Sequence, residues 1–160
     1  MKREVLILGN ETLYEVCELI AEDELEKAKR VAKDLEDTLD VFRAEKGFGR
    51  AIAAPQIGET VRLIFMKLED MTTVFANPCM EVLDEETFEL WDDCMSFPGL
   101  EVKVERYKKI RVTYRDLDWQ IQSQVFEGDL AELFQHEFDH LNGVLAVHRA
   151  MDEKSFRMSI

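Results

Sequence analysis

The sequence is poor in histidine and cysteine, and it lacks a long apolar run. Three of its 160 residues are histidine and three are cysteine, too few cysteines to suggest the disulfide framework of many small secreted proteins. No apolar stretch approaches the roughly 18 residues that a membrane-spanning helix requires, and the apolar stretch near the N-terminus is too short for a secretory signal. We therefore expect a cytoplasmic protein without membrane partners.

Basic residues are also in the minority. Lysine and arginine total 20 against 34 aspartates and glutamates, which gives a formal net charge of −14. A chain this acidic offers no basic stripe to a phosphate backbone, so we do not expect direct nucleic-acid binding. The hydrophobic fraction of 46% is sufficient for a core, and no repeat, linker or low-complexity tract interrupts the chain. The sequence therefore predicts one domain over residues 1–160.

Two of the three histidines belong to one H-E-x-x-H motif, which runs from His136 to His140. Residues four apart lie on the same face of a helix, so these two imidazoles can share one metal ion. Glu137 lies beside such an ion and is placed to take a proton from metal-bound water. A solvated helix with two incidental histidines is the alternative, and the scarcity of histidine argues against it.

Two imidazoles do not complete a metal site, and the candidates for a third ligand are Cys17, Cys79, Cys94 and His148. Cys94 lies in a polar stretch, residues 91–99, that ends in Pro and Gly and is typical of a loop or strand margin. A thiolate with two imidazoles leaves one position for water, which is the composition of a catalytic site. Cys17 and Cys79 have apolar neighbours and are predicted to be buried, inert thiols. For His148 we expect a surface or packing role.

Three stretches, in the same order along the chain, resemble motifs of the peptide deformylases. They are Ile52-Ala53-Ala54-Pro55-Gln56 after a glycine-containing segment, Asp92-Asp93-Cys94-Met95-Ser96 where the family has Glu-Gly-Cys-Leu-Ser, and Gln135 to Leu141 followed by Gly143. The third motif is intact. The resemblance covers nearly the whole chain, and the combination of the three motifs is highly specific.

The resemblance implies a metal-dependent hydrolase. It would remove the N-formyl group from the N-terminal methionine of newly made polypeptides, so its partners would be N-formylmethionyl peptides or nascent chains. The resemblance also implies that Cys94, His136 and His140 bind one divalent metal ion. Fe²⁺ is expected in the cell, and Zn²⁺ or Ni²⁺ is possible in isolated protein. Glu137 would be the general base, while the Gln56 side chain and the Met95 N–H would donate hydrogen bonds to the substrate carbonyl.

Several residues near the expected substrate site depart from the family pattern. Ala51 replaces a glycine, Asp93 replaces the glycine before the cysteine, and Glu101 stands where an arginine is expected. Changes toward acid around a cleft can alter substrate preference. The residues that we expect near the substrate are Gly49, Ala51, Ile52, Asp93 and Glu101. Asp92 replaces a glutamate and is predicted to contact Arg106.

These departures leave two alternatives open. One is a deformylase-like paralogue that acts on another formylated or acylated amine. The other is a non-catalytic, metal-bound peptide-binding protein. A general metallopeptidase is less favoured, because a helical H-E-x-x-H peptidase does not usually recruit a thiolate. The sequence leaves three roles open for Asp139. Its carboxylate could orient a metal-binding histidine, pair with a buried arginine, or face solvent.

The apolar pattern predicts an α+β fold in which antiparallel strands pack around a central metal-binding helix, with an amphipathic helix nearer the N-terminus. That N-terminal helix spans about residues 22–45 and ends at Gly47; a coiled coil is its weaker alternative. The expected short strands cover residues 61–66, 74–76, 81–83 and 88–91, and residues 109–114 and 120–126 form a hairpin. Asp129 is predicted to cap the metal-binding helix and Gly143 to end it.

Overall fold

The structure is a computed structural model of the chain, and it describes residues 1–159. The helices are α1 (Leu25–Lys46) and α2 (Asp129–Leu141). The strands are β1 (Ala51–Ala53), β2 (Leu63–Lys67), β3 (Thr72–Asp92), β4 (Leu100–Arg115), β5 (Ile121–Glu127) and β6 (Phe156–Met158). Short 3-10 helices are η1 (Glu11–Tyr14), η2 (Glu22–Glu24), η3 (Ala54–Ile57) and η4 (Ala146–Arg149).

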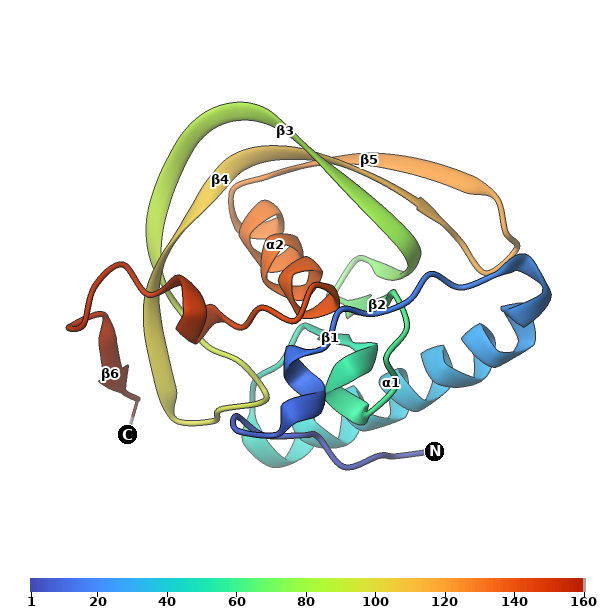
Figure 1. The fold of residues 1–160 in the computed structure, drawn as a ribbon, viewed down its shortest axis with the longest axis horizontal. Helices are drawn as coiled ribbons and strands as arrows, with labels where there is room; N and C mark the ends of the chain where they lie inside the picture. Colours follow the sequence, from blue (N-terminus) through green and yellow to red (C-terminus); the bar gives the residue numbers. More distant parts are fainter. Residues whose placement is uncertain (160) are drawn as a thin grey trace.

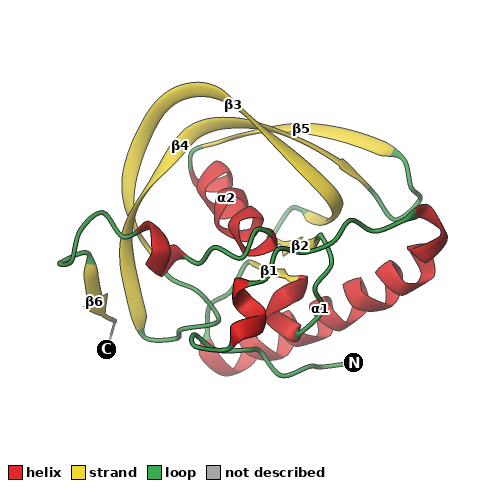
Figure 2. Cartoon of the chain, viewed as in Figure 1, coloured by secondary structure: helices red, strands yellow, loops and turns green. Residues whose placement is uncertain are grey.

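The strands form an antiparallel sheet that curves around α2. Its order is β1-β2-β3-β4-β5, and β6 pairs with β4. The long strands β3, β4 and β5 arch over α2, while α1 lies beside β1 and β2 (Figure 1). This arrangement confirms the predicted α+β fold with antiparallel strands, and Figure 2 shows the helix inside the curve of the sheet. Among residues 1–159, none of the helices is long and apolar enough to cross a membrane.

Helix α1 confirms the predicted amphipathic helix. Its buried residues, which include Leu35, Leu39 and Phe42, recur at three- and four-residue steps and pack with residues of β1 and β2 in one apolar cluster. Gly47 ends the helix in the left-handed conformation, with φ of 79°, and its N–H donates to the Arg43 carbonyl. The stripe thus packs into the core of this domain, and the coiled-coil alternative is wrong.

Strand β3 corrects the prediction of several short strands between residues 74 and 91. It is continuous from Thr72 to Asp92, because it pairs with β4 along most of its length. Register shifts between Ala76 and Cys79, and on both sides of Asp84, absorb the segments that appear as breaks in the sequence. One shift contains Pro78, which lacks the N–H that regular pairing would need.

The predicted hairpin is present, and its first strand is longer than the sequence pattern indicates. Strands β4 and β5 pair from Lys109 with Glu127 to Arg115 with Ile121. However, β4 begins at Leu100, because its first half pairs with β3 on one side and with β6 at the C-terminal end of the chain. The last strand therefore ties the C-terminal segment to the sheet.

Helix α2 is almost completely enclosed. Ten of its residues are buried, and its apolar side chains pack against aromatic residues of the sheet, for example Phe134 against Phe75 and Phe126. The prediction that Asp129 caps the helix is wrong. The cap position is Gly128, whose φ of 60° suits glycine, and no side chain caps the helix there. The helix ends at Leu141, two residues before Gly143.

Candidate active site

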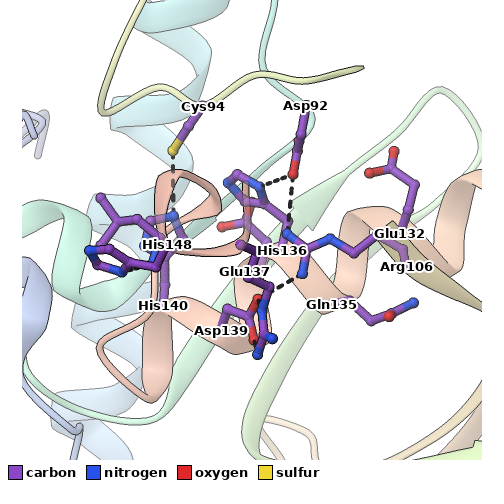
Figure 3. Close-up of polar contacts among 12 residues, drawn as sticks. Asp92, Cys94, Arg106, Glu132, Gln135, His136, Glu137, Asp139, His140 and His148 are labelled. Atoms are coloured by element: carbon purple, nitrogen blue, oxygen red, sulfur yellow. Dashed lines mark hydrogen bonds and ion pairs between the residues drawn. The ribbon is translucent and has the colours of Figure 1, made fainter. Parts of the chain in front are cut away.

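Three predicted metal ligands converge at the buried end of a cleft. Cys94 lies in the turn after β3, whereas His136 and His140 project from one face of α2. One ligand atom from each lies within 4.8 Å of the others, and all three side chains are buried. The Cys94 Sγ and His140 Nε2 atoms are 3.4 Å apart (Figure 3). The fold thus brings a thiol from a loop to two imidazoles on a helix.

Asp92 fixes the orientation of one of these imidazoles. Its carboxylate lies 2.8 Å from His136 Nδ1 and 3.2 Å from Arg106 Nη2, so the predicted contact between Asp92 and Arg106 is confirmed. Because an ionised carboxylate can only accept, Nδ1 of His136 is the nitrogen that donates to Asp92, so Nε2 is the atom that can bind a metal ion when the imidazole is neutral. The sequence reasoning assigned no contact between Asp92 and His136.

Asp139 pairs with arginines rather than with a metal-site histidine. Its carboxylate accepts from buried Arg106 at 2.7 Å and from Arg149 at 2.6 and 2.9 Å. The expectation of a buried arginine partner is therefore confirmed, and the expectation that it faces solvent is wrong because Asp139 is buried. Arg106 pairs with both Asp92 and Asp139, and in this way connects the end of β3 to the metal-binding helix.

Burial and neighbouring charges shift the pKa values of the site. Burial alone would raise the pKa of Asp92, but His136 and Arg106 hold it below its ordinary value. Burial opposes protonation of His136, yet Asp92 and Cys94 raise its pKa well above the ordinary value. Burial, with the charge of His136, lowers the pKa of His140 well below its ordinary value, which keeps that imidazole neutral and able to ligate a metal.

Glu137 is a buried carboxyl group with an unsatisfied oxygen. Burial raises its pKa to about 7, and among the described residues its Oε1 atom has no hydrogen-bonding partner. Its other oxygen lies 3.9 Å from His136 Nε2. A buried carboxylate of this kind requires a partner that these side chains do not supply, such as water or a substrate group.

Gln56 and Met95 place hydrogen-bond donors beside the thiol. The Gln56 amide is oriented by the Ala53 N–H, which donates to its oxygen at 3.0 Å, while its nitrogen donates to Ser96 Oγ at 3.0 Å and lies 3.6 Å from Cys94 Sγ. The Met95 N–H makes no hydrogen bond to residues 1–159. Both groups border the cleft.

The cleft has a volume of about 320 Å³, and most of the predicted site residues border it. Gly49, Ala51 and Asp93 do so. Ile52 does not, because its side chain is fully buried in the core around α1. Glu101 also lies outside the lining, and its carboxylate pairs with Arg157 at 3.0 Å.

The substitution at Ala51 is compatible with the backbone. Ala51 lies in β1 and pairs with Met66, and it is not among the described residues with positive φ. A methyl group therefore costs no backbone strain there. Gly49 differs, because its φ is 116° and a Cβ atom would lie 3.3 Å from the Leu39 side chain.

Sequence reasoning missed two charged residues that border the cleft. Arg50 donates to Glu132 at 3.0 Å and to Asp129 at 2.6 Å. Glu132 is buried, and burial together with the nearby Asp92 charge raises its pKa to about 7. The sequence could have predicted the position of Glu132, because it lies four residues before His136 and this spacing places both side chains on the same helix face.

The remaining thiols and His148 lie apart from the site. Cys17 is buried, and burial raises its pKa to about 11, so the prediction of an inert thiol holds for it. The same prediction is wrong for Cys79, which is exposed, because tertiary pairing leaves this part of β3 facing solvent. His148 accepts from the Leu145 N–H and contacts the Tyr14 ring, as expected of a packing residue.

The donor set fits a divalent metal ion. A thiol and two imidazoles are the ligands preferred by Zn²⁺ and related transition metals. The close approach of Cys94 and His140, together with the oriented His136 ring, gives a compact group of ligand atoms. With a buried carboxyl group beside the ligands and an open cleft above them, this chain has the architecture of a metal-dependent hydrolase.

Comparison with known proteins narrows that class to one family. A family model described as polypeptide deformylase matches residues 2–156. The chain therefore belongs to the polypeptide deformylase family. A peptide deformylase of Dictyoglomus thermophilum is 35% identical over 154 residues, which is 96% of this chain and 95% of the relative. One from Thermotoga petrophila is 37% identical over 122 residues, or 76% of this chain and 73% of the relative.

Solved structures of the family share the fold. The crystal structure of peptide deformylase from Thermotoga maritima aligns with a TM-score of 0.86 at 30% identity, covering 95% of this chain and 99% of that one. The Synechococcus elongatus peptide deformylase in complex with actinonin aligns with a TM-score of 0.80 at 32% identity, covering 94% and 80%. These relatives support a deformylase and do not favour the two alternatives left open by the sequence.

Proposed function

We propose that this chain hydrolyses the N-formyl group from the N-terminal methionine of newly made polypeptides. One observation carries the proposal: Cys94, His136 and His140 gather their ligand atoms within 4.8 Å, beside buried Glu137 at the base of a cleft, in a chain of the polypeptide deformylase family. The substrates would be N-formylmethionyl peptides or nascent chains.

Cys94, His136 and His140 would hold one divalent ion. A bound metal ion of this kind supplies Lewis acidity, which lowers the pKa of water from about 16 toward about 7. Fe²⁺ is proposed for the cell, and Zn²⁺ or Ni²⁺ for isolated protein, since all three accept imidazole and thiolate ligands. The hydrogen bond from His136 to Asp92 would keep that imidazole in the ligating orientation.

Glu137 would act as the general base and then as the general acid. Its pKa of about 7 is close to the pH of the cell interior, where a group transfers protons most effectively. Water adds to the formyl carbon while Glu137 takes one of its protons. The bond between the formyl carbon and nitrogen then breaks as Glu137 returns a proton to the departing amine, so formate and a free N-terminus are released.

Gln56 and Met95 would stabilise the negative charge that grows on the formyl oxygen. The Gln56 nitrogen is held near Cys94 and Ser96, and Met95, whose N–H makes no hydrogen bond within residues 1–159, borders the same cleft. Fixed donors of this type lower the transition-state barrier because they need no reorganisation during the reaction. Loss of one donor typically costs about 3 kcal/mol.

The peptide would lie along the segment that contains Gly49, Ala51 and Ile52. Gly49 borders the cleft, and so does Ala51 at the start of β1. Asp93 would face the substrate directly, whereas Glu101, which is paired with Arg157, would act on it only from outside the cleft lining. A cytoplasmic location is part of the proposal, because nascent chains are made there and a reducing compartment protects the Cys94 thiol.

The test is release of formate from a short formyl-methionyl peptide by anaerobically purified, Fe²⁺-loaded protein. Replacement of Glu137 by alanine should retain the metal ion and reduce formate release by about 100-fold to 10,000-fold. Metal content is measured on the same samples, because lost metal would also abolish turnover. Equal turnover by the Glu137→Ala variant would rule out the proposed base, and no release by metal-filled wild-type protein would rule out the proposed function.

Restoring glycine at position 93 tests the main departure in the cleft. Asp93 is exposed, and desolvation together with the adjacent Asp92 charge raises its pKa. Because Asp93 borders the cleft, removing its carboxyl group in Asp93→Gly should raise turnover of acidic peptides more than turnover of neutral ones. Asp70→Gly is the matched control, since Asp70 is an exposed carboxyl residue that does not border the cleft, and the substitution should leave turnover unchanged.

A further inference from the structure

The wall of the cleft next to the metal ligands is ionic. Arg50 Nη2 lies 3.0 Å from Glu132 Oε1, and both residues border the cleft. The Glu132 side chain is only 6% exposed, whereas that of Arg50 is 42% exposed. In Figure 3 the Glu132 carboxyl group lies on the same side of α2 as Asp92. None of the metal-binding or proton-transfer steps described above uses this ion pair.

Helix geometry places Glu132, one member of this ion pair, one turn from a metal ligand. Glu132 precedes His136 by four residues, so it occupies the same face of α2 about one turn, roughly 5.4 Å, away. In a formylated residue, the side chain branches from the carbon bonded to the formyl nitrogen. When the formyl carbon reaches the metal ligands, that side chain needs space beside them, and the cleft next to His136 is lined by Glu132 and Leu133.

The charge balance of this wall favours a positive group. The cleft lining contains the carboxyl groups of Asp93, Glu132 and Glu137 against the guanidinium groups of two arginines. The lining also includes Asp92, but Arg106 and His136 already pair with it. Arg50 is shared between Glu132 and Asp129. Of the two carboxylate oxygens of Glu132, only Oε1 accepts a hydrogen bond from another residue within 1–159. A cation arriving in the cleft would meet a buried carboxylate with one oxygen still available.

An apolar side chain would gain less from the same wall. It would remove water from the ion pair without replacing the lost hydrogen bonds, which is costly for partly buried charges. A lysine side chain can pack its methylene groups on Leu133 and direct its ammonium group to Glu132. A methionine side chain can pack on Leu133, but it has no hydrogen-bond donor or positive charge for the Glu132 carboxylate.

We propose that the Arg50–Glu132 pair extends the substrate range of this site to formylated residues with basic side chains. The inference rests on the proposed deformylation and concerns only the side chain of the residue that carries the formyl group. Such a substrate is a peptide or amine in which a formylated lysine-like residue takes the place of formyl-methionine. Glu132 acts here as a specificity residue that contacts the substrate, and Arg50 holds it in place.

The experiment compares formyl-lysyl and formyl-norleucyl dipeptides, which differ at the end of the side chain by the ammonium group. Formate release is measured with Fe²⁺-loaded protein at pH about 8, where the Glu132 carboxyl is mostly ionised. We expect kcat/KM for the lysyl peptide to equal or exceed that for the norleucyl peptide. The Glu132→Gln substitution should lower the lysyl-to-norleucyl ratio about tenfold, the size of effect expected for losing one specific contact in a binding site.

Asp129→Asn is the matched control. Asp129 also pairs with Arg50, but its side chain is 75% exposed, so the substitution should leave the ratio within about twofold of wild type, because exposed ion pairs contribute little. A wild-type ratio below one, or a ratio that Glu132→Gln leaves unchanged, overturns the inference. Preference for a formyl-glutamyl peptide would overturn it as well, since Arg50 would then dominate the recognition.

A second measurement separates this inference from the proposed function. If no peptide releases formate, the reaction assigned to the site is wrong, but the preference can still be measured as binding. Calorimetry with metal-loaded Glu137→Gln protein should then show tighter binding of the lysyl than of the norleucyl peptide, and Glu132→Gln in the same background should abolish the difference. Equal binding of the two peptides contradicts the role of the ion pair.

Discussion

Replacement of Arg106 by methionine should destabilise the protein strongly. The Arg106 side chain is 3% exposed and pairs with Asp92 at 3.2 Å and with Asp139 at 2.7 Å. Methionine has a similar length and fills much of the same space, but it cannot neutralise either carboxylate. The substitution therefore leaves two carboxylates in the protein interior without their shared cation.

The structure indicates the magnitude of the loss. Removing one partner of a buried ion pair typically costs about 3–5 kcal/mol. Here each carboxylate keeps another partner, since Asp92 retains His136 and Asp139 retains Arg149. We therefore expect the lower end, about 3 kcal/mol of unfolding free energy. For a chain of this size that corresponds to a fall in Tm of about 6–12 °C.

The assay is urea and thermal unfolding of wild-type and variant protein in the same metal-loaded state. Arg149→Met is the control, because Arg149 also pairs with Asp139 but is 48% exposed, and its loss should cost at most about 1 kcal/mol. Adding Asp92→Asn to Arg106→Met should recover part of the stability, since one unpaired charge is removed. A loss below about 1 kcal/mol, or equal losses for Arg106→Met and Arg149→Met, would refute this account of the network.

Three further predictions follow from the same structure. Asp92→Asn should weaken metal binding about 10-fold to 100-fold in chelator competition, because an orienting hydrogen bond is lost; unchanged affinity would contradict that role. Gly143→Ala should cost at least about 2 kcal/mol in urea unfolding, since φ is 73° and the new Cβ would lie 2.4 Å from the Tyr14 carbonyl oxygen. Gly58→Ala, at φ of 86° with no atom within 4 Å, should cost only about 1–2 kcal/mol; an equal cost would show that the close contact is unimportant. The Glu132 pKa is raised from 4.5 to about 7, so the stability gained by keeping it protonated is complete below pH 4.5 and is lost as pH rises through 7. Measured against Glu132→Gln at each pH, wild-type stability should fall by up to about 3 kcal/mol across that window, and a flat difference would contradict the assignment.

Much of the candidate site could be predicted because its signals are local or carried by specific motifs. The spacing of His136 and His140 fixes their common face on any helix, and the surrounding motif identified Cys94 as the partner. The long amphipathic helix was predictable for the same reason, since a three- and four-residue apolar period with a terminal Gly47 has one common structural solution. The contact between Asp92 and Arg106 came from the family resemblance.

The errors arose where neighbours distant in sequence decide the outcome. Strand β3 is continuous because β4 pairs along it and bulges absorb its irregularities, and no local pattern reveals that partner. The same pairing exposes Cys79 despite its apolar neighbours in sequence. Asp129 looked like a helix cap, but the structure uses Gly128 there and turns the carboxylate to Arg50.

The sequence by itself determined the chemistry of this protein. A thiol, two imidazoles and a carboxyl group in these motifs indicate a metal-dependent deformylase, because ligand type and helical spacing depend on residues close together in the chain. Only the tertiary structure decided how charge is arranged around that chemistry. The contact between Arg50 and Glu132 joins residues 82 positions apart in the sequence. The contact between Cys94 and His140 joins residues 46 positions apart. Such contacts depend on how the sheet curves around α2, a property of the whole fold that local sequence does not encode.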